Sequence, residues 1–447
     1  MRLPLWPFLL LFIFGAVWGT ACDDSSSNNN HDAGPDVDII DAGDDSDISD
    51  ADADVISVDC DAQSECVPWE PTEGVPPEYN IRIDDLACDD LFSNIRINRT
   101  GFGNYYSFDC YYQPAGVTKG QTVLMNLDTL DASPISPSCA DCSYYNSWIN
   151  GNWLVAEKFN YSSPGNDIEL HRYRLTSDTW STVLAVPGAD VGYPMITGTG
   201  GMLYLSNEGS SDSGNYSLNY YHLETNDSTM LEELEGSIDG YFTGDELIAW
   251  SVYYYKDGVE STTLKVADPA TWEVRTIRRA TKYPIYIYPV ISKKHVVFDS
   301  FSVLCGKGVY NLKMYDWESD VVTDVKVDRF WDTPTGYAFR WPLIAYADHS
   351  VACSGYVLPG GAIATNASYL VLHDLETGVR RPLPIPLTGL YDLEGMTITH
   401  KNELIYRRHP NFSEKYYYLL NLYDAGFIDE EGHVIPDPTF PTTDATP

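Results

Sequence analysis

The chain has 447 residues, of which 44% are hydrophobic, enough for a packed core in one large domain or in several average ones. Its 65 acidic and 27 basic residues give a formal net charge of -38. This charge argues against nucleic-acid binding, because phosphates are neutralised by clustered Lys and Arg. It also disfavours direct docking on anionic lipid.

The N-terminal segment is predicted to be an export signal. Met1-Arg2 precedes an apolar run from Leu5 to Val17, which at 13 residues is too short to span a bilayer but is typical of a signal peptide, here residues 1–21. Gly19-Thr20-Ala21-Cys22 then resembles a bacterial lipobox. The resemblance implies cleavage after Ala21 and a lipid on Cys22. Ordinary secretory cleavage would cut the same bond and would leave a secreted protein with an unmodified Cys22.

Residues 22–78 are predicted to be a disordered acidic linker. From Leu3 to Asn80 the sequence has 18 acidic residues and neither Lys nor Arg. Such a composition buries too little apolar surface to offset the entropy lost on ordering. We therefore expect the folded part to stand clear of the outer membrane or cell surface of a Gram-negative bacterium, attached to the membrane by its lipid alone.

Eight cysteines remain after Cys22, and an even number in an exported chain predicts disulfides. Sequence proximity favours pairs Cys60–Cys66 and Cys88–Cys110. Cys139 and Cys142 have the spacing of a redox motif, but no helical pattern follows them, and a zinc site would need a second ligand pair. We expect structural disulfides, no metal ligand and no cofactor. The disulfide candidates are Cys60, Cys66, Cys88, Cys110, Cys139, Cys142, Cys305 and Cys353.

A short signature recurs seven times along the rest of the chain. Each copy is a hydrophobic residue, usually Leu, then in most copies an acidic or hydroxyl residue, then a turn. The successive spacings are 48, 48, 44, 48, 60 and 47 residues, and a period in this range indicates repeated supersecondary units. The copies begin at Leu127, Leu175, Leu223, Ala267, Tyr315, Leu375 and Leu422.

Four short strands are predicted in each repeat. Examples are Tyr193–Ile196 before a turn, Trp153–Ala156 after one, the strand that ends in the signature, and Trp180–Leu184 after it. Four-stranded units of this length are the blades of a β-propeller, whose closed ring protects the sheet edges. The sequence therefore predicts an all-β, seven-bladed β-propeller, with six or eight blades as alternatives.

His373–Gly378 resembles the strand-turn-strand step of the TolB-type, WD40-like propeller repeats. The resemblance implies a propeller domain, placed at residues 79–430, with a C-terminal tail at 431–447. We expect the extended stretch Tyr79–Ile83 to close the ring against the last blade. The longest interval contains an insertion at Ser354–Thr365, which either belongs to a binding face or is a neutral surface loop.

No catalytic motif is recognisable, since the sequence contains neither a Gly-x-Ser-x-Gly elbow nor a His-Glu-x-x-His helix. Aromatic clusters such as Tyr144-Tyr145 suit blade packing better than sugar stacking. Three arginine pairs, at Arg278, Arg380 and Arg407, suit solvated strand ends or an acidic ligand. These features favour a monomeric binding module for a protein or glycan partner.

The alternative is a propeller-fold carbohydrate-active enzyme, a glycan hydrolase or lyase. Its carboxylates would come from distant parts of the chain and meet at the central channel. Two facing carboxylates beside a His or Tyr would favour this alternative. Fold analogy alone cannot decide between binding and catalysis.

Overall fold

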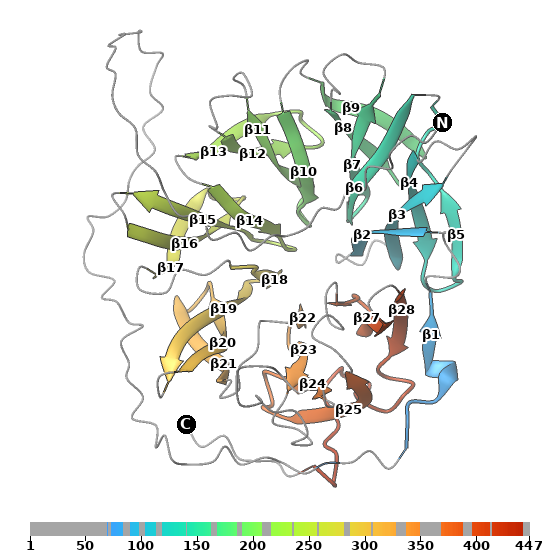
Figure 1. Cartoon of the computed structure of the whole chain (residues 1–447), viewed down its shortest axis with the longest axis vertical. Helices are drawn as coiled ribbons and strands as arrows, with labels where there is room; N and C mark the ends of the chain where they lie inside the picture. The colour runs from blue at the N-terminus through green and yellow to red at the C-terminus, as the bar shows by residue number, and fades with distance from the viewer. Residues whose placement is uncertain are drawn as a thin grey trace, which may run out of the picture. The chain divides into compact units, whose positions relative to one another are not determined.

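The computed structural model describes residues 69, 73–83, 90–97, 103–112, 119–139, 141–161, 168–185, 190–207, 216–234, 237–256, 259–280, 287–304, 307–327, 337–348, 368–387, 396–411 and 414–440. All belong to the second of two units of the chain, residues 50–447. This unit is a seven-bladed β-propeller, as predicted (Figure 1). Among the described residues no helix has the length and apolar character needed to span a membrane.

The first four blades are antiparallel sheets built from consecutive strands. In spatial order, blade 1 has β2 (Asp90–Ile97), β3 (Tyr105–Tyr112), β4 (Lys119–Asn126) and β5 (Asp131–Pro134); blade 2 has β6 (Cys142–Asn150), β7 (Trp153–Asn160), β8 (Ile168–Arg174) and β9 (Thr179–Ala185); blade 3 has β10 (Asp190–Ile196), β11 (Gly201–Asn207), β12 (Tyr216–His222) and β13 (Ser228–Leu234); blade 4 has β14 (Ser237–Thr243), β15 (Ile248–Lys256), β16 (Val259–Asp268) and β17 (Glu273–Ala280).

Blades 5 and 6 follow the same plan, and blade 7 borrows its fourth strand from the start of the domain. Blade 5 has β18 (Val290–Ser292), β19 (His295–Leu304), β20 (Lys307–Asp316) and β21 (Val321–Val327); blade 6 has β22 (Tyr337–Arg340), β23 (Leu343–Asp348), β24 (Ser368–Asp374) and β25 (Arg380–Leu387); blade 7 has β26 (Thr397–Ile398), β27 (Glu403–Asn411), β28 (Glu414–Asn421) and β1 (Asn80–Arg82), which follows the short 3-10 helix η2 (Pro77–Tyr79).

The first strand of each blade lies toward the middle of the ring and the fourth toward its rim (Figure 1). From blade 1 to blade 7 the first strands of successive blades are in contact. We call the surface formed by these first strands the channel wall.

Seven apolar clusters fill the seven interfaces between neighbouring blades. The second strand of blade 3 shows how one strand serves two of them. Met202 and Tyr204 pack toward blade 2, whereas Leu203 between them packs toward blade 4. Because side chains alternate along a strand and both faces are covered, such strands are apolar throughout.

The signature turns are built alike. They join the third and fourth strands in blades 1 to 6, whereas in blade 7 the turn follows β28 and leads into the C-terminal segment. In five blades the last strand residue is Asn or Asp, and its side-chain oxygen accepts a backbone N–H two or three residues further on. The turn ends in all seven blades on a residue with positive φ, such as Leu130 (61°), Gly378 (73°) or, in blade 7, Gly426 (72°). The capping residues are Asn126, Asp268, Asp316, Asp374 and Asn421.

The structure corrects the signature by two residues in blades 4 and 5. Leu223 N donates to Gly200 O, and the residue that makes the same bond in blade 5 is Trp317, to Lys294 O, not Tyr315. By the same pairing, Pro269 replaces Ala267 in blade 4. The spacings of 44 and 60 residues become 46 and 58. A two-residue slip leaves every side chain on the same face of a strand, so alternation could not reveal it.

The expected ring closure by Tyr79–Ile83 is confirmed. β1 pairs antiparallel with β28, with Ile81 opposite Leu419, and Ile83 N donates to Tyr417 O at 2.9 Å. The Ile83 side chain is fully buried in the cluster between blades 7 and 1. The ring is thus closed by strands from opposite ends of the domain.

Packing continues beyond residues 79–430 on both sides. Trp69 is 5% exposed, its ring meets that of Tyr369 edge-on at 4.8 Å, and its Nε1 donates to Asp437 Oδ2 at 3.2 Å. Phe440 belongs to the same cluster between blades 5 and 6. We call this contact between the two ends of the domain the Trp69 clasp.

Candidate functional site

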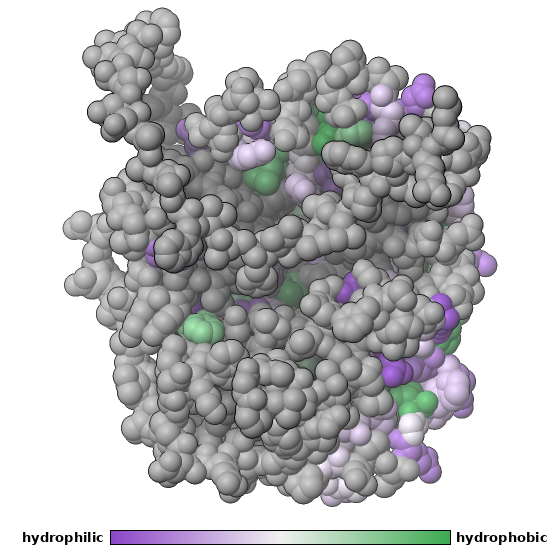
Figure 2. Space-filling model, viewed as in Figure 1, coloured by the Kyte–Doolittle hydropathy of each residue, from purple (hydrophilic) through white to green (hydrophobic). Residues whose placement is uncertain are grey.

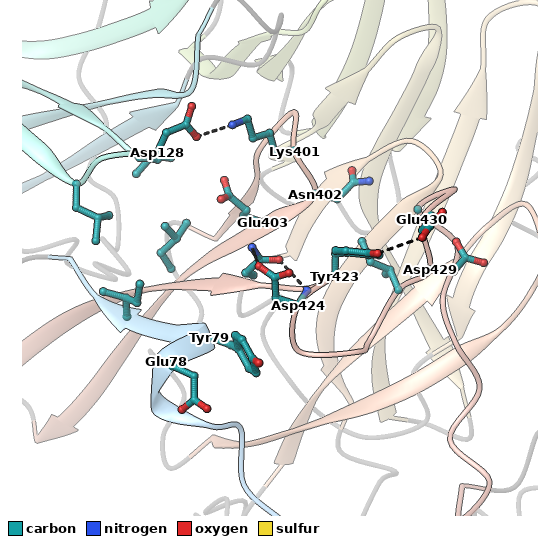
Figure 3. Close-up of a pocket in the computed structure, with 17 residues that line it drawn as sticks. Glu78, Tyr79, Asp128, Lys401, Asn402, Glu403, Tyr423, Asp424, Asp429 and Glu430 are labelled. Carbon is teal, nitrogen blue, oxygen red and sulfur yellow. Dashed lines mark hydrogen bonds and ion pairs between the residues drawn. The ribbon is translucent and has the colours of Figure 1, made fainter.

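A groove of about 850 Å³ lies at the seam where blade 7 meets blade 1 (Figure 3). Glu78 and Tyr79 of the N-terminal segment lie on one side of the view, and Tyr423 and Glu430, which follow β28, lie on the other. Leu127, Leu130, Ile81, Leu419 and Ile428 supply its apolar part. The space-filling view shows hydrophilic beside hydrophobic surface at the right-hand edge, over β28 and β1 (Figure 2).

Acidic side chains dominate this seam groove. Six carboxylates line it, against one lysine, Lys401. Like charges gathered in a concave surface raise the local concentration of counter-charged ligands. The groove therefore suits a cationic ligand with an apolar part. The carboxylates belong to Glu78, Asp128, Glu403, Asp424, Asp429 and Glu430.

Hydrogen bonds hold several of these carboxylates in place. Asp128 Oδ1 accepts from Lys401 Nζ at 2.6 Å and from Asn104 Nδ2 at 2.9 Å. Partial burial raises the pKa of Asp128, but these two hydrogen bonds outweigh it, so the pKa lies below its ordinary value. Asn104 Nδ2 also donates to the buried Glu403 Oε2 at 3.0 Å. These contacts join blade 1 to blade 7 across the groove.

Asp429 and Glu430 belong to the segment after β28, and their carboxylates are held differently. Asp429 Oδ1 accepts the backbone N–H of His433 at 2.8 Å, whereas the contact of Glu430 with the Tyr423 hydroxyl is long, at 3.5 Å. Glu430 and Asp424 are exposed. These two carboxylates are therefore accessible to a ligand.

A second polar region lies at the channel wall, where blades 2 and 3 meet. Glu157 of β7 is 5% exposed, and its Oε2 accepts from Asn146 Nδ2 at 2.7 Å. Its Oε1 accepts the backbone N–H of Tyr193 in the next blade. Asp109 of β3 acts similarly one blade earlier, because its Oδ2 accepts from Ser147 N at 3.0 Å. Both carboxylates thus hold the first strand of the following blade.

Two members of the arginine pairs, Arg278 and Arg381, connect blades, whereas Arg380 acts within one blade. Arg278 Nη1 of blade 4 donates to Asp299 O of blade 5 at 2.7 Å, and Arg380 forms an ion pair with the buried Asp348 of its own blade, blade 6. Arg381 Nη1 donates to Gly426 O at 2.7 Å. Arg407 is 3% exposed. These guanidinium groups therefore stabilise the ring.

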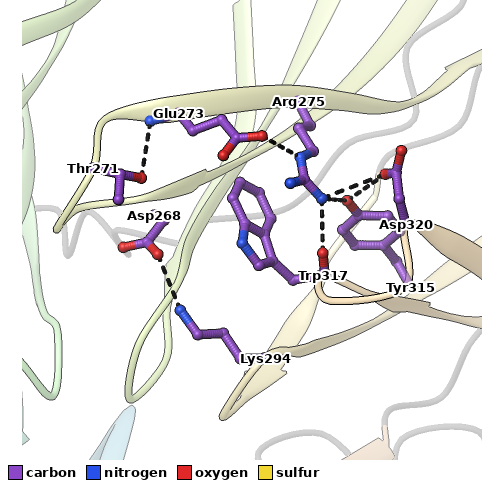
Figure 4. Close-up of polar contacts among 8 residues, drawn as sticks. All are labelled: Asp268, Thr271, Glu273, Arg275, Lys294, Tyr315, Trp317 and Asp320. Atoms are coloured by element: carbon purple, nitrogen blue, oxygen red, sulfur yellow. Dashed lines mark hydrogen bonds and ion pairs between the residues drawn. The ribbon is translucent and has the colours of Figure 1, made fainter.

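Blades 4 and 5 show the same kind of link beside their signature turns (Figure 4). Arg275 Nη1 donates to Trp317 O at 2.7 Å, and its guanidinium lies 4.0 Å from the centre of the Trp317 ring. Lys294 Nζ donates to Asp268 Oδ2 at 3.0 Å. Burial raises the pKa of Asp268, but hydrogen bonds from Ala270 N and Lys294 keep it below its ordinary value.

The predicted packing of the aromatic clusters is confirmed in part among the described residues, since Tyr144 and Tyr417 are buried whereas Tyr288 is 45% exposed. Tyr144 is 4% exposed and its ring meets that of Trp180 at 5.2 Å. Tyr417 is 2% exposed, and the ring of Tyr418 stacks on Tyr406 at 5.4 Å. Tyr144 and Tyr417 are therefore core residues.

Cys139 and Cys142 are joined by a disulfide. Cys110 is also disulfide-bonded, and its pairing with Cys88 stays a prediction. Cys22, Cys60, Cys66, Cys88, Cys305 and Cys353 lie outside the described residues, as do the insertion Ser354–Thr365 and the predicted signal peptide. Within the described ranges, no three His, Cys, Asp or Glu side chains are grouped to hold a metal ion.

No family model matches the sequence, and no curated protein matches it. Solved structures do match the fold. The oligogalacturonate lyase of Vibrio parahaemolyticus is 10% identical, with 77% of this chain and 94% of that chain covered and a TM-score of 0.49. The propeller domain of the Trilobed protease of Pyrococcus furiosus is 11% identical (74% and 94% covered, TM-score 0.47), and TolB of Acinetobacter baumannii 13% (74% and 81%, TM-score 0.34).

The likeness is one of fold. All three identities lie below 25% and all three TM-scores below 0.5, so these structures do not indicate what this chain does. Its function must be argued from its own residues.

Proposed function

We propose that this protein is a monomeric, non-enzymatic binding module, anchored by lipid on Cys22 to the outer membrane or cell surface of a Gram-negative bacterium. Its seam groove receives a segment of a partner protein that carries Lys or Arg beside apolar side chains. The observation that carries this proposal is the groove itself, with six carboxylates, one lysine and an apolar part.

Two physical arguments support a basic protein segment as the ligand. Carboxylates that are already fixed by hydrogen bonds, such as Asp128 and Asp429, lose little freedom when a partner binds. The surplus negative charge accelerates the approach of a basic partner and repels an acidic one. Leu130 and Ile81 offer apolar contact to the same segment.

Fluorescence anisotropy with the mature chain tests this proposal. The probe is a labelled peptide of alternating Lys and Leu, and the control probe alternates Glu and Leu. We expect only the Lys peptide to bind, and added salt to weaken it. Combining Asp424→Asn with Glu430→Gln should weaken binding roughly tenfold, at about 1.4 kcal/mol for the two charges.

The matched control combines Glu224→Gln with Glu273→Gln, which removes two exposed carboxylates from blades 3 and 4. This variant should bind as the unaltered protein does. Equal weakening by both double variants, or equal binding of both peptides, would show that overall charge and not the groove attracts the probe.

The lipid anchor has its own test. Intact mass of the mature protein should show a diacylated Cys22, and Cys22→Ser should move the protein from the membrane to the soluble fraction. A Cys22→Ser variant that remains with the membrane would overturn the anchoring proposal and leave the groove untouched.

The alternative of a glycan hydrolase or lyase predicts product release from oligosaccharides. Asp109 and Glu157 are two of the described carboxylates beside the channel wall, and both accept hydrogen bonds that position backbone or amide groups. This use supports a structural role for them. Chromatographic detection of cleaved oligosaccharide by the mature chain, abolished in Glu157→Gln, would favour the enzyme.

A further inference from the structure

One position of the channel wall carries an exposed tyrosine in two blades. Tyr193-Pro194 of blade 3 and Tyr288-Pro289 of blade 5 occupy the same register, because Met195 pairs with Leu203 as Val290 pairs with Val297. Tyr193 is 63% exposed and Tyr288 45% exposed. Blade 4 lies between them, and there Gly240 stands two residues before Phe242, which pairs with Ala249 as Met195 pairs with Leu203. The Tyr288 ring meets the Phe242 ring of blade 4 edge-on at 6.2 Å.

The backbone at Tyr193 is held in an unusual conformation. Its φ is +56°, and the register of β10 shifts between Gly192 and Met195. A positive φ is rare for a bulky side chain and is associated with functional sites, as are bulges, which redirect side chains. Asn146 takes the same position in blade 2, with φ +50° and a register shift beside it.

The buried Glu157 fixes both residues. It accepts hydrogen bonds from Asn146 Nδ2 and from Tyr193 N, and a Cβ at Gly192 would lie 3.0 Å from its Oε1. The Glu157 carboxylate is therefore buried and accepts hydrogen bonds from the bulged residues of blades 2 and 3. At this position the described residues of blades 2, 3 and 5 are Asn146, Tyr193 and Tyr288, which carry no formal charge.

We propose that Tyr193 with the neighbouring Asn146, and Tyr288 two blades away from Tyr193, stack on separate pyranose rings of one neutral oligosaccharide and together form its subsite. The C–H face of a sugar packs on aromatic rings, and an Asn amide offers both a donor and an acceptor to hydroxyl groups. An acidic sugar is disfavoured, because residues 81–447 carry 47 acidic and 26 basic side chains. The subsite uses none of the seam-groove residues, so it goes beyond the function proposed above.

Isothermal titration calorimetry and saturation-transfer NMR on the mature chain test the subsite. The probes are cellotetraose, chitotetraose and maltotetraose, with tetragalacturonate as the acidic comparison. We expect at least one neutral probe to bind and to show saturation transfer. Tyr288→Ala and Tyr193→Asn should each weaken it by about fivefold to tenfold. Tyr193→Asn is chosen because Asn stands at this position in blade 2 with positive φ, so the bulge is retained.

Tyr193→Phe, which keeps the ring, should bind within about twofold of the unaltered protein. The matched control is Met230→Ala, which removes a 58% exposed side chain from the outer strand β13. Failure of all three neutral probes to bind, binding of tetragalacturonate alone, or full binding by Tyr193→Asn and Tyr288→Ala would each overturn the subsite. Binding of the Lys–Leu peptide is measured in a separate experiment, so failure of the sugar subsite does not contradict the proposed function of the seam groove. Failure of the peptide to bind likewise does not contradict the subsite.

Discussion

The signature turns and the channel wall repeat in different ways. At the turns, five blades place Asn or Asp at the same position, and each caps the turn in the same manner. At the channel wall, one position changes from Asn146 to Tyr193, Gly240 and Tyr288 in successive blades. The uniform positions build blades, and the varied ones make blades 2 to 5 chemically distinct around the channel.

The largest loss of stability is expected at a signature turn. Trp317 is 7% exposed, packs between blades 4 and 5, and lies under the Arg275 guanidinium. Trp317→Ala should lower the free energy of unfolding by about 4 kcal/mol, because a large core ring is replaced by a cavity. Urea denaturation measures this change. Trp272→Ala, which removes a 40% exposed ring, should lower the free energy of unfolding by less than half as much. An equal loss would show that burial of the Trp317 ring is not the cause of its effect.

A somewhat smaller effect is expected at the seam. Ile83→Ala removes a fully buried side chain from the cluster between blades 7 and 1 and should cost about 3 kcal/mol. Thermal unfolding should show the loss as a lower Tm. Ile81→Ala, at a partly exposed position two residues earlier, should cost about 1 kcal/mol. An unchanged Tm for Ile83→Ala would mean that the N-terminal strand does not stabilise the ring.

A pH-dependent effect is expected at the interface of blades 4, 5 and 6. Burial raises the pKa of Asp299 to about 7, although the Arg278 charge lowers it, and Tyr337 lies close by. The folded protein therefore keeps this proton up to about pH 7, whereas the unfolded chain loses it near pH 4. The free energy of unfolding should fall as the pH rises between these values.

Asp299→Asn removes this titration. Relative to the unaltered protein, we expect the variant to gain roughly 3 to 4 kcal/mol of stability between pH 4 and pH 8, measured by urea denaturation at both values. Asp324→Asn, at an exposed carboxylate of blade 5, serves as control and should show no such gain. If the free energy of unfolding changes with pH in the same way in Asp299→Asn and in the unaltered protein, a group other than Asp299 binds the proton.

The smallest effect belongs to the exposed ion pair over the groove. Asp128 and Lys401 are 44% and 47% exposed in their side chains, so solvent and salt weaken their attraction. Lys401→Ala should change the free energy of unfolding by less than about 0.5 kcal/mol. It should, however, strengthen binding of the Lys–Leu peptide, since it removes the only lysine lining the groove. Weaker peptide binding would contradict the proposed role of the groove's charge.

Most of the fold could be predicted from the sequence, because a period near 48 residues and alternating apolar strands leave few architectures. The expectation that Tyr79–Ile83 closes the ring needed only an unpaired strand-like stretch before the first blade. The register error at Ala267 and Tyr315 came from matching residue types, whereas the structure aligns the turns by hydrogen bonds such as Trp317 N to Lys294 O.

The candidate sites were less accessible to sequence reasoning. The seam groove joins residues near position 78 to residues 401–432, and only ring closure brings them together. The tyrosines of the channel did leave a signal, since Tyr193-Pro194 and Tyr288-Pro289 stand in the same short motif ahead of a hydrophobic pair. Their exposure could not be inferred, because tyrosine in a propeller strand is more often buried packing, as Tyr144 and Tyr417 are.

The Trp69 clasp has a mechanical consequence for the proposed anchoring through the N-terminus. If Cys22 carries the proposed lipid, tension along the chain would reach Trp69 before it reaches β1, which begins eleven residues later at Asn80. The load would pass first to the Tyr369 ring of blade 6 and to the Asp437 carboxylate of the C-terminal segment. The three-residue strand that closes the ring would then bear less of a pull on the anchor.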